Sequence, residues 1–526
     1  MTSPTGPTGP TRPLGALIGR LADAGRLRGT RVEGRAVGAA ALADLVVSAP
    51  VTHDSRTVEP GGIFVAIAGD HLDGHDFAAA ALDRGATALV VERPLPEIGI
   101  AQIVVDKTRP ALGEAAAWWW GDPSRELTVV GITGTDGKTT TGYLAVSALE
   151  AAGIRTGMIG TIATRIGGQT VDHAAHATTP EAPEIQAALR TMVESGDRAV
   201  VLETTSHGLA LDRVAGVRYD VAILTNLTHE HLDLHGTWEA YRDAKLSLFA
   251  RLRDAADGAG IVNLDDPSAG AFIGVTRDAR ARVMTYGTDP AADVRATHVT
   301  DDGRGLRLDV EAPTTSGPLQ VNLAGRFNAH NALAVVALGE VLALDPNAVR
   351  RGIAAVERVP GRMERIDAGQ PFGVIVDFAH SPASLRTVLD LLAPTAAARG
   401  GGLIAVFGSA GERDTAKRAQ MGRIAGERSK LVVVTEEDPR GEDPVAVLEQ
   451  IAEGAEAGGR RRGHDLLVVQ DRREAIAAAF ERARPGDIVL LAGKGHEQSI
   501  IGPDGERPWD EAGVARELLA ELGHAG

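Results

Sequence analysis

Short apolar runs recur through the middle of the chain, and each is followed by a polar or glycine-rich segment. These runs are LTVVGI (127–132), RAVVLE (198–203), DVAILTN (220–226) and GIVNLDD (260–266). The stretches between them have helical character, and residues 139–152 predict a helix directly after the first run. Strands that alternate with helices are typical of a mostly parallel, doubly wound sheet. The pattern therefore predicts an α/β fold.

The same alternation occurs before and after this central part. Residues 14–120 mix short apolar strands, such as GGIFVAIAG and ATALVVE, with alanine-rich helical stretches. A third set begins near VERVPGRMERI and comprises the strands FGVIVDFAH, GGLIAVFGS, KLVVVTE and DIVLLAGKG. Ligands bind beyond the carboxyl ends of the strands in open α/β sheets. We therefore expect the chemistry of the protein in the polar loops that follow these runs.

The length of the chain predicts three domains. The polar, proline- and glycine-rich opening predicts a disordered tail over residues 1–13. The segment GDPSREL (121–127) has the composition of a linker. We predict an N-terminal α/β domain over 14–124, a central doubly wound domain with a P-loop-like site over 125–356, and a Rossmann-like C-terminal domain over 357–526.

Charge and composition exclude several classes of protein. Lys and Arg number 54 against 70 Asp and Glu, which gives a formal net charge of −16. Such a chain offers no broad surface for nucleic acid or an anionic membrane, so positive charge must be local where a phosphate binds. The absence of cysteine excludes disulfides, thiolate nucleophiles and cysteine-ligated metals. No apolar run has the length of a membrane helix or the form of a signal-peptide core, so we expect a cytoplasmic protein without membrane insertion.

The segment GITGTDGKTTT, which follows the first central strand, has the residues of a phosphate-binding turn. Ile132 stands where the common P-loop has its first glycine, and the glycine spacing also differs from that of a dinucleotide fold. Strand, glycine-rich turn and helix nevertheless form the context in which backbone N–H groups bind phosphate. Lys138 would reach the terminal phosphates, and Thr139 would place its hydroxyl on a magnesium ion. The alternative is a tight turn with a surface lysine.

This loop resembles the ATP-binding signature of the Mur ligase family, and further motifs of that family follow along nearly the whole chain. They are VLETTSHGLALDR (201–213), TNLTHEHLDLHG (225–236), YRDAK (241–245), GRFNAHN (325–331), GRME (361–364), DFAHSP (377–382), GERDTAKR (411–418) and GKGHE (493–497). The segment DSRTVEPGGIFVAIAGDHLDGHDF (54–77) resembles the uridine-nucleotide domain of the branch that adds the third peptide residue. The resemblance implies an ATP-dependent amide ligase of cytoplasmic peptidoglycan precursor synthesis, a process tied to cell shape and cell division.

The same resemblance implies the residues that bind ATP and metal. ATP contacts would fall on Gly134, Thr135, Asp136, Gly137, Lys138, Thr139, Thr140, Asn328, Arg362, Asp377 and His380. The ligands of Mg²⁺ would be Thr139, Glu203, His231 and Lys245, the last as a CO₂-derived carbamate. Lys138, Glu203, His231 and Lys245 would be catalytic. For Lys245 the alternative is an unmodified lysine in a surface ion pair, and for His380 it is a structural histidine.

The chemistry of an ATP-dependent ligase agrees with these assignments. Transfer of a γ-phosphate to a carboxylate brings two anions together and needs cations between them. A lysine ammonium cannot ligate magnesium, whereas a carbamate offers two oxygens. The stretch HEHLD (229–233) begins like a zinc-protease helix, but Asp233 stands where the second histidine is required. The spacing therefore excludes a zinc hydrolase.

The substrates implied by the resemblance are UDP-MurNAc-L-Ala-D-Glu, ATP and a diamino acid. Ser55 and the loop of Asp70, His71 and Leu72 would bind the uridine diphosphate. The muramoyl-peptide part would contact Thr178, Thr179, Thr205 and Arg213. The diamino acid would contact Arg413, Glu437, Asp438, Pro439, Arg440, Gly493 and Glu497.

The identity of the added amino acid depends on a short departure from the family pattern. Members that add meso-diaminopimelate usually carry Asp-Asn-Pro-Arg, and this chain has Glu437-Asp438-Pro439-Arg440. We favour meso-diaminopimelate, whose distal carboxylate would pair with Arg440 and whose ammonium would pair with Glu497. The extra carboxylate of Asp438 would favour L-lysine or L-ornithine if Glu437 or Asp438 neutralised Arg440.

Further departures and alternatives remain open. Asp136 stands where the family more often has Asn or Ser, Ala177 where it often has Asn, Leu211 where it often has Gln, and His229-Glu230 where it commonly has Arg-Asp. The alternatives are another ligase of the superfamily, such as folylpolyglutamate synthetase or cyanophycin synthetase, a nucleotide-dependent switch or scaffold, and an inactive paralogue. We expect a monomer.

Overall fold

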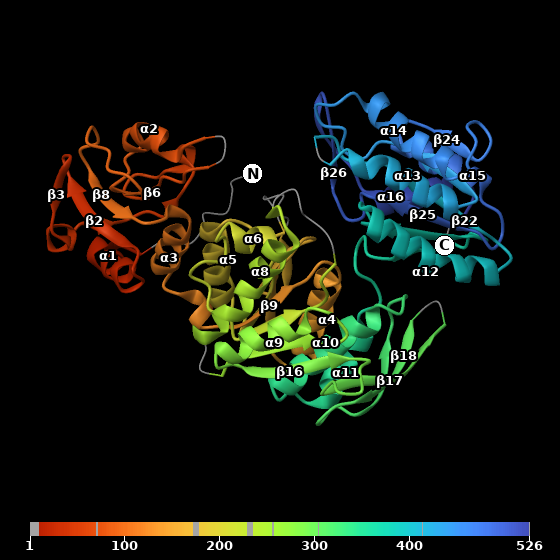
Figure 1. The fold of residues 1–526 in the computed structure, drawn as a ribbon, viewed down its shortest axis with the longest axis horizontal. Helices are drawn as coiled ribbons and strands as arrows, with labels where there is room; N and C mark the ends of the chain where they lie inside the picture. Colours follow the sequence, from red (N-terminus) through yellow and green to blue (C-terminus); the bar gives the residue numbers. More distant parts are fainter. Residues whose placement is uncertain are drawn as a thin grey trace. The chain divides into compact units, whose positions relative to one another are not determined.

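Three larger β-sheets organise the fold, and helices alternate with their strands along the chain (Figure 1). The structure is a computed structural model that describes residues 10–69, 72–171, 178–228, 235–254, 257–302, 305–412 and 414–524. The chain divides into two compact units. The first unit holds Met1–His298, Asp309–Leu319 and His330–Ile353, and the second holds Val299–Leu308, Gln320–Ala329 and Ala354–Gly526.

The first sheet has six strands in the order β3-β2-β8-β7-β6-β5. Its strands are β2 (Leu27–Val32), β3 (Arg35–Val37), β5 (Val51–Thr52), β6 (Ile63–Val65), β7 (Ala88–Val91) and β8 (Ala101–Val105). A separate short pair joins β1 (Arg12–Pro13) to β4 (Val46–Val47). The run β5 to β8 is parallel, whereas β2 and β3 pair in antiparallel fashion.

Helices cover both faces of this sheet. They are α1 (Leu14–Asp23), α2 (Ala78–Asp83) and α3 (Thr108–Trp120). Leu14, Leu17 and Leu21 recur on one side of α1 at helical spacing, and all three are buried together with Trp119 of α3. Burial of this apolar stripe fixes α1 and α3 on one face, while α2 packs with Phe64 in a separate cluster.

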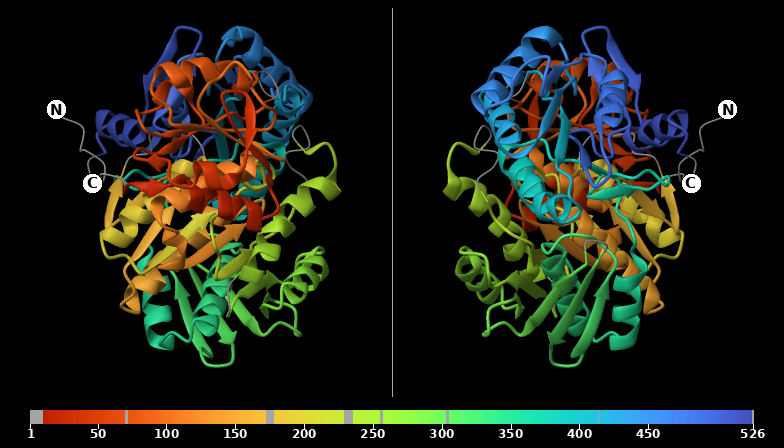
Figure 2. Two further views of the ribbon diagram at one scale, coloured as in Figure 1. Left: turned by 90° about the vertical axis from the view of Figure 1, so that its left-hand side faces the viewer. Right: turned by 90° about the vertical axis from the view of Figure 1, so that its right-hand side faces the viewer.

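The central sheet has eleven strands in the order β12-β11-β10-β13-β9-β14-β15-β16-β17-β18-β19. Its strands β9, β16, β17 and β18 are labelled in Figure 1, and Figure 2 gives two further views of the ribbon. They are β9 (Thr128–Thr133), β10 (Thr156–Ile159), β11 (Thr164–Ile166), β12 (Gln169–Val171), β13 (Ala199–Glu203), β14 (Val221–Leu224), β15 (Ala259–Asn263), β16 (Arg282–Gly287), β17 (Val294–Asp301), β18 (Leu306–Glu311) and β19 (Gly317–Val321). The strands from β10 to β17 in this order are mutually parallel. The division between the two compact units falls within β17, β18 and β19.

The position of β9 creates the point where ligands bind in such sheets. The chain builds β10 and β13 on one side of β9 and then β14 and β15 on the other. In sheets of this kind, ligands bind beyond the carboxyl ends of the strands at the point where the winding reverses. The glycine-rich segment follows β9, and Glu203 ends the neighbouring strand β13.

The helices of this part are α4 (Lys138–Ala151), α5 (Ala182–Glu194), α6 (Ser206–Ala210), α8 (Trp238–Ala250), α9 (Ala269–Asp278), α10 (Asn328–Val341) and α11 (Pro346–Ala355). One core cluster joins α5, α8 and α9 to β9, β13 and β14. It includes Phe249 and Phe272, whose ring centres are 5.0 Å apart. Ser147 of α4 donates a hydrogen bond to the carbonyl of Gly352 in α11 at 2.7 Å, and a Cβ on Gly352 would lie 2.4 Å from Ala148. Glycine at 352 therefore permits α4 and α11 to pack closely.

The third sheet has six strands in the order β20-β21-β25-β22-β23-β24. They are β20 (Glu364–Ile366), β21 (Gly373–Asp377), β22 (Leu403–Phe407), β23 (Leu431–Val434), β24 (Leu466–Val468) and β25 (Ile488–Ala492). The helices are α12 (Pro382–Ala398), α13 (Ala416–Arg428), α14 (Pro444–Ala457), α15 (Arg472–Arg482) and α16 (Glu511–Glu521), and a hairpin joins β26 (Ser499–Gly502) to β27 (Gly505–Pro508). All strands except β20 are parallel, and β25 lies between β21 and β22.

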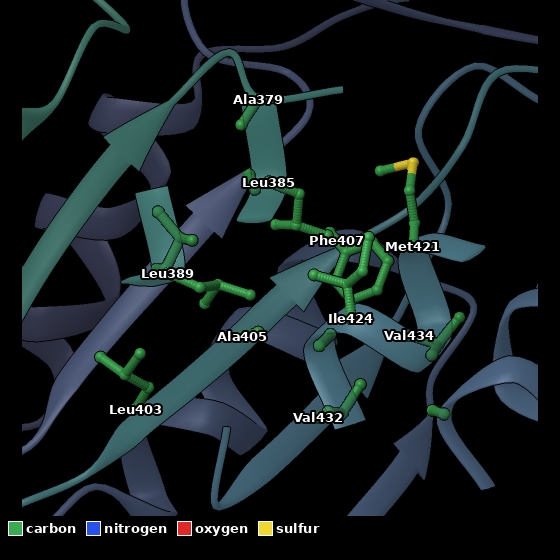
Figure 3. Packing of buried hydrophobic residues seen from close by; sticks show 14 of the residues in the cluster. Ala379, Leu385, Leu389, Leu403, Ala405, Phe407, Met421, Ile424, Val432 and Val434 are labelled. Atoms are coloured by element: carbon green, nitrogen blue, oxygen red, sulfur yellow. The ribbon is translucent and has the colours of Figure 1, made fainter. Parts of the chain in front are cut away.

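Alternate residues of these strands point to opposite faces of the sheet and pack into two hydrophobic cores, one on each face. Leu385 and Leu389 of α12 and Ile424 of α13 pack over Ala405 and Phe407 of β22 (Figure 3). On the opposite face, α15 and α16 pack over the other residues of the same strands. Burial on both faces explains why these strands read as continuous apolar runs rather than as alternating ones.

The structure confirms the predicted α/β class with parallel sheets. Each apolar run quoted from the sequence contains a strand, and the predicted helix at 139–152 is α4. The sequence did not predict the extension of the central sheet by β17, β18 and β19. The domain limits at residues 124 and 356 stay predictions. None of the helices in the described residues has the length and apolarity to cross a membrane.

Candidate active site

The glycine-rich segment forms a tight turn between β9 and α4. The helix begins at Lys138 after Gly137, which has a left-handed φ of 82°. The unbonded N–H groups of the first turn therefore face the carboxyl edge of the sheet, where they stabilise an anion. The Nζ of Lys138 donates hydrogen bonds to the carbonyls of Gly134 at 3.0 Å and Thr135 at 2.8 Å. The ammonium thus lies over the turn.

The turn is held through its main chain. The Oγ1 of Thr225 donates to the carbonyl of Asp136 at 2.6 Å, and Nδ2 of Asn226 donates to the same oxygen at 3.2 Å. The N–H of Asp136 donates in turn to Oδ1 of Asn226 at 3.0 Å. The side chain of Asp136 is exposed to solvent, where its charge is screened. The departure from the family pattern at this position therefore leaves the shape of the loop intact.

Two close approaches require glycine in the loop. Gly134 has a φ of 152°, and a Cβ there would lie 1.9 Å from Oγ1 of Thr225. A Cβ on Gly137 would lie 2.5 Å from Oδ1 of Asn331. That oxygen also accepts a hydrogen bond from Oγ1 of Thr141 at 3.2 Å. Asn331 therefore joins α10 to the helix of the phosphate loop.

Substitution of Gly137 by alanine should weaken ATP binding at least about tenfold, because the left-handed backbone would be strained by about 1–2 kcal/mol and Asn331 displaced. Gly153→Ala is the matched control, because Gly153 has a φ of 80° just beyond α4 and a Cβ there meets nothing within 4 Å. Calorimetric titration with ATP and magnesium measures both variants. Equal losses of affinity in both would contradict the role assigned to Gly137.

Glu203 forms the second part of the site. It ends β13 and is fully buried. Its Oε2 accepts hydrogen bonds from Oγ1 of Thr139 at 2.9 Å and from Oγ1 of Thr161 at 2.8 Å, and its Oε1 accepts from the N–H of Thr161 at 3.1 Å. A Cβ on Gly160 would lie 2.4 Å from Oε1, so the loop after β10 closes tightly on the carboxylate. Thr161 is a neighbour of the site that the sequence did not reveal.

Lys245 lies on α8 and is buried, with 2% of its surface exposed. Its Nζ donates a hydrogen bond to the carbonyl of Gly134 at 2.8 Å and lies 4.7 Å from the centre of the Tyr241 ring. The hydroxyl of Tyr241 is in turn 2.9 Å from Oγ1 of Thr135. Lys245 is therefore not a surface residue, and the fold places it against the phosphate loop.

The described donors fit a magnesium ion. Glu203 supplies a carboxylate and Thr139 a hydroxyl, and hard oxygen ligands of this kind suit Mg²⁺. Groups of three or more His, Asp or Glu side chains in metal-binding positions do not occur within the described residues. His231, the remaining predicted ligand, lies outside the described residues.

The residues predicted to hold the muramoyl-peptide part meet beside the end of β13: Thr178, Thr179, Thr205 and Arg213. The Oγ1 of Thr179 donates to the carbonyl of Glu203 at 2.9 Å and accepts from the N–H of Thr205 at 3.0 Å. Arg213 donates to the carbonyl of Thr179 at 3.0 Å and forms an ion pair with Glu181 at 2.8 Å. Half-buried Thr178 precedes Thr179 in the chain.

The residues predicted to bind uridine diphosphate belong to loops of the first sheet. Ser55 begins a short 3₁₀ turn, Ser55–Thr57, which Asp54 caps by accepting a hydrogen bond from the N–H of Arg56 at 2.9 Å. Leu72 is 69% exposed. Asp70 and His71 lie outside the described residues.

The third sheet brings together the other residues predicted to bind ATP. The guanidinium carbon of Arg362 lies 4.7 Å from the centre of the Phe378 ring. The centre of the His380 ring lies 4.5 Å from the centre of the same Phe378 ring. Asp377 ends β21 and accepts from the N–H of Met363 at 2.7 Å. The Nε of Arg362 is buried and, within the described part of the chain, has no hydrogen-bond partner. Such an unused donor is available to an anionic ligand.

Asn328 begins α10 and is buried, and its Nδ2 donates to the carbonyl of Ala324 at 2.7 Å. Asn331, whose contacts with the loop helix are given above, stands three positions further in the same motif. The sequence did not assign a role to Asn331, although the second asparagine of its Gly-x-x-Asn-x-x-Asn segment was the signal that marked it.

Two carboxylates of the predicted amino-acid site pair with one buried lysine. The Nζ of Lys494 lies 2.8 Å from Oδ1 of Asp438 and 2.6 Å from Oε2 of Glu497. The same Oδ1 of Asp438 accepts a hydrogen bond from the N–H of Ile501 at 2.9 Å. The charge that Asp438 adds relative to asparagine is thus compensated inside the protein, a partner that the sequence did not reveal.

Glu437 is a third carboxylate at this edge. It is 5% exposed, and within the described residues its Oε2 has no hydrogen-bond partner. Burial raises the pKa of Glu437, while Lys417 and Lys494 act in the opposite direction. A Cβ on Gly493, which has a φ of 103°, would lie 2.6 Å from that oxygen. Glycine at 493 therefore leaves the space that Glu437 occupies.

Arg440 follows Pro439 and adopts a positive φ of 55°. Its N–H donates to the carbonyl of Ile501 at 2.9 Å, which fixes the bend. As far as the described residues go, Nε of Arg440 is buried without a hydrogen-bond partner. Asp438 pairs with Lys494 and does not neutralise this guanidinium. Arg413 lies outside the described residues.

Comparison with known proteins agrees with this geometry. The family models match in succession: "Mur ligase family, catalytic domain" over residues 49–120, "Mur ligase middle domain" over residues 132–339, and "Mur ligase, glutamate ligase domain" over residues 361–495. The UDP-N-acetylmuramyl-tripeptide synthetase of Roseiflexus sp. (strain RS-1) is 47% identical over 495 residues, which cover 91% of this chain and 96% of the relative. The chain belongs to the Mur ligase family, as the resemblance implied.

Two further similarities are equally extensive. The UDP-N-acetylmuramoyl-L-alanyl-D-glutamate–2,6-diaminopimelate ligase of Geobacter metallireducens is 44% identical over 467 residues, covering 85% of this chain and 90% of the relative. A solved structure of a ligase of the same name superposes with a TM-score of 0.64 at 30% identity, covering 90% of this chain and 95% of the other. The similarity therefore extends over all three sheets.

Proposed function

We propose that the protein is an ATP-dependent ligase that adds the third residue, meso-diaminopimelate, to UDP-MurNAc-L-Ala-D-Glu through an acyl phosphate. The observation that carries this proposal is the placement of Glu203, Thr139 and Lys245 around one phosphate loop. A nucleotide switch needs the loop but has no need of a buried lysine beside it. The names of the two relatives above support the same substrate class.

In the first step the γ-phosphate of ATP passes to the free carboxylate of the dipeptide. The N–H groups of the first turn of α4 bind phosphate oxygens, and Lys138 exchanges its carbonyl contacts for the terminal phosphates. A bound magnesium ion would offset the repulsion between the two anions, and Glu203, Thr139 and His231 would hold it. The remaining ATP contacts are proposed for Gly134, Thr135, Asp136, Gly137, Thr140, Asn328, Arg362, Asp377 and His380.

We propose that Lys245 acts as a carbamate. The ammonium first loses one proton; the neutral amine then adds to CO₂, a nitrogen–carbon bond forms and a second proton is released, so that the side chain changes from a cation to an oxygen anion. The contact of Nζ with the carbonyl of Gly134 supports this assignment, because that carbonyl belongs to the phosphate loop.

In the second step the amine of the incoming amino acid attacks the acyl phosphate and releases inorganic phosphate. The distal carboxylate of meso-diaminopimelate pairs with Arg440, whose Nε is buried and available. Arg413, Glu437, Asp438, Pro439, Gly493 and Glu497 are proposed to complete this pocket. The alternative acceptors are L-lysine and L-ornithine, which the acidic stretch around Glu437 would favour.

We propose that this reaction takes place in the cytoplasm and that the protein works as a monomer. The uridine diphosphate would bind Ser55 and the loop of Asp70, His71 and Leu72. The peptide would contact Thr178, Thr179, Thr205 and Arg213, of which Thr179 is hydrogen-bonded to both Thr205 and Arg213.

The direct test is product formation. The protein is incubated with ATP, magnesium and UDP-MurNAc-L-Ala-D-Glu, and meso-diaminopimelate, L-lysine or L-ornithine is added separately. We expect a UDP-linked tripeptide with meso-diaminopimelate, identified by mass, together with one phosphate per product. Omission of ATP is the control. Product with lysine or ornithine alone would favour the alternative acceptors, and no product with any of them would overturn the proposed function.

A further inference from the structure

Lys494 has no role in the reaction described above, although it is the buried cation of the amino-acid site. Only 1% of its side chain is exposed, against 10% for Asp438 and 36% for Glu497. Asp438 follows β23 and Lys494 follows β25, so the pair links the ends of two strands that lie on either side of β22. Burial of a lysine between carboxylates is costly unless each charge is compensated. The burial of Lys494 at this position therefore indicates that the amino-acid site needs its positive charge.

Lys494 offsets the negative charge of the two carboxylates that it contacts, Asp438 and Glu497. Burial raises the pKa of Glu497, and Lys494 acts in the opposite direction. Glu437 is buried against Gly493, and desolvation favours the neutral form of its carboxyl group. Loss of the lysine would leave an excess of negative charge beside the more exposed carboxylate of Glu497.

We propose that Lys494 is a positioning residue that sets the selectivity of this site between diamino acids, through its ion pairs with Asp438 and Glu497. The inference rests on the proposed function. A side chain that ends in both a carboxylate and an ammonium, as in meso-diaminopimelate, suits a balanced pocket. A side chain that ends in a bare ammonium, as in L-lysine, suits a pocket with excess negative charge.

The test is a cycle of variants that moves the net charge in both directions. Lys494→Met removes a positive charge, Asp438→Asn removes a negative charge, and the double variant removes both. For each protein, kcat/KM is measured with meso-diaminopimelate and with L-lysine. We expect Lys494→Met to shift the ratio about tenfold toward lysine and Asp438→Asn to shift it in the opposite direction. The double variant should return to within about threefold of the original ratio.

A matched control separates charge from folding. Lys430 pairs with the buried carboxylate of Asp487 at 2.5 Å, at the opposite end of the same sheet, so Lys430→Met removes a comparable ion pair far along the strands. Lys430 is 40% exposed, so the variant controls for the loss of a lysine–carboxylate pair rather than for the loss of a buried lysine, and it should leave the ratio unchanged. If Lys494→Met does not fold, Asp438→Asn decides, because its amide has the shape of the carboxylate and Lys494 keeps Glu497 as a partner.

The outcomes distinguish a failure of the role proposed for Lys494 from a failure of the proposed function. Equal losses of kcat/KM for both amino acids, with the ratio unmoved in every variant, would mean that Lys494 is only structural and would overturn the inference. Absence of product with any diamino acid in the unmodified protein would overturn the proposed function instead.

Discussion

Replacement of Glu203 by glutamine is expected to lower kcat about a thousandfold, a loss of about 4 kcal/mol of transition-state stabilisation. The amide keeps the size of the carboxylate, and the hydroxyls of Thr139 and Thr161 can rotate to accept from its new N–H group. The fold should therefore persist. The anionic oxygen that would bind magnesium is lost, and with it the charge that allows two anions to approach. Steady-state ligation at saturating ATP and magnesium measures the effect.

The matched control is Asp220→Asn. Asp220 belongs to the same central sheet but lies at the amino-terminal ends of its strands, opposite the ends that carry the site. Asp220 precedes β14, accepts a hydrogen bond from the N–H of Val129 at 2.9 Å, and is partly buried, which raises the pKa of its carboxyl group. The change from carboxylate to amide there should leave kcat nearly unaltered. A kcat for Glu203→Gln within about tenfold of the original would remove Glu203 from the metal site.

Replacement of Arg472 by methionine should destabilise the third sheet by about 3–5 kcal/mol, because it leaves the buried carboxylate of Glu511 without its cation. Both side chains are fully buried, and their shortest contact is 2.6 Å. Arg472 also donates to the carbonyls of Glu436 at 3.0 Å and Ala492 at 2.8 Å. It therefore fixes the ends of β23 and β25, from which Glu437 and Gly493 continue.

Hydrogen exchange of the amides in β22, β23 and β25 measures this loss where it occurs. Exchange should accelerate by a factor of about 100 or more. The adjacent Arg473 supplies the control, because it makes ion pairs with Glu517 and Glu521 on the surface, where solvent screens such pairs and they contribute little to stability. Arg473→Met should therefore leave exchange nearly unchanged, and similar acceleration in both variants would refute the special role of Arg472.

The sequence predicted those parts of the site whose chemistry is local. The turn between β9 and α4 could be predicted because its strand, glycines, lysine and helix are consecutive. The strand β18 also carries a local signal that was not used, since LRLDVE alternates buried and exposed residues. The Mur ligase resemblance extended these predictions to residues far apart in the chain.

The remaining features arise from contacts between distant positions. Lys494 and Asp438 are 56 residues apart, and Thr141 and Asn331 are 190 residues apart. Periodicity and motif spacing carry no information about such pairs, because they depend on which strands become neighbours. The sequence could therefore mark Asp438 as an added charge, but it could not reveal the lysine that compensates it.

The way in which the phosphate loop is held has a consequence for its evolution. Thr225 and Asn226 grip the carbonyl and N–H of residue 136, which every amino acid except proline supplies in full. The residue at this position can therefore be substituted without loss of the loop's shape, and a charged side chain there costs the loop little stability. The neighbouring glycines at 134 and 137 have no such freedom, because their α-hydrogens occupy the space where a side chain would begin.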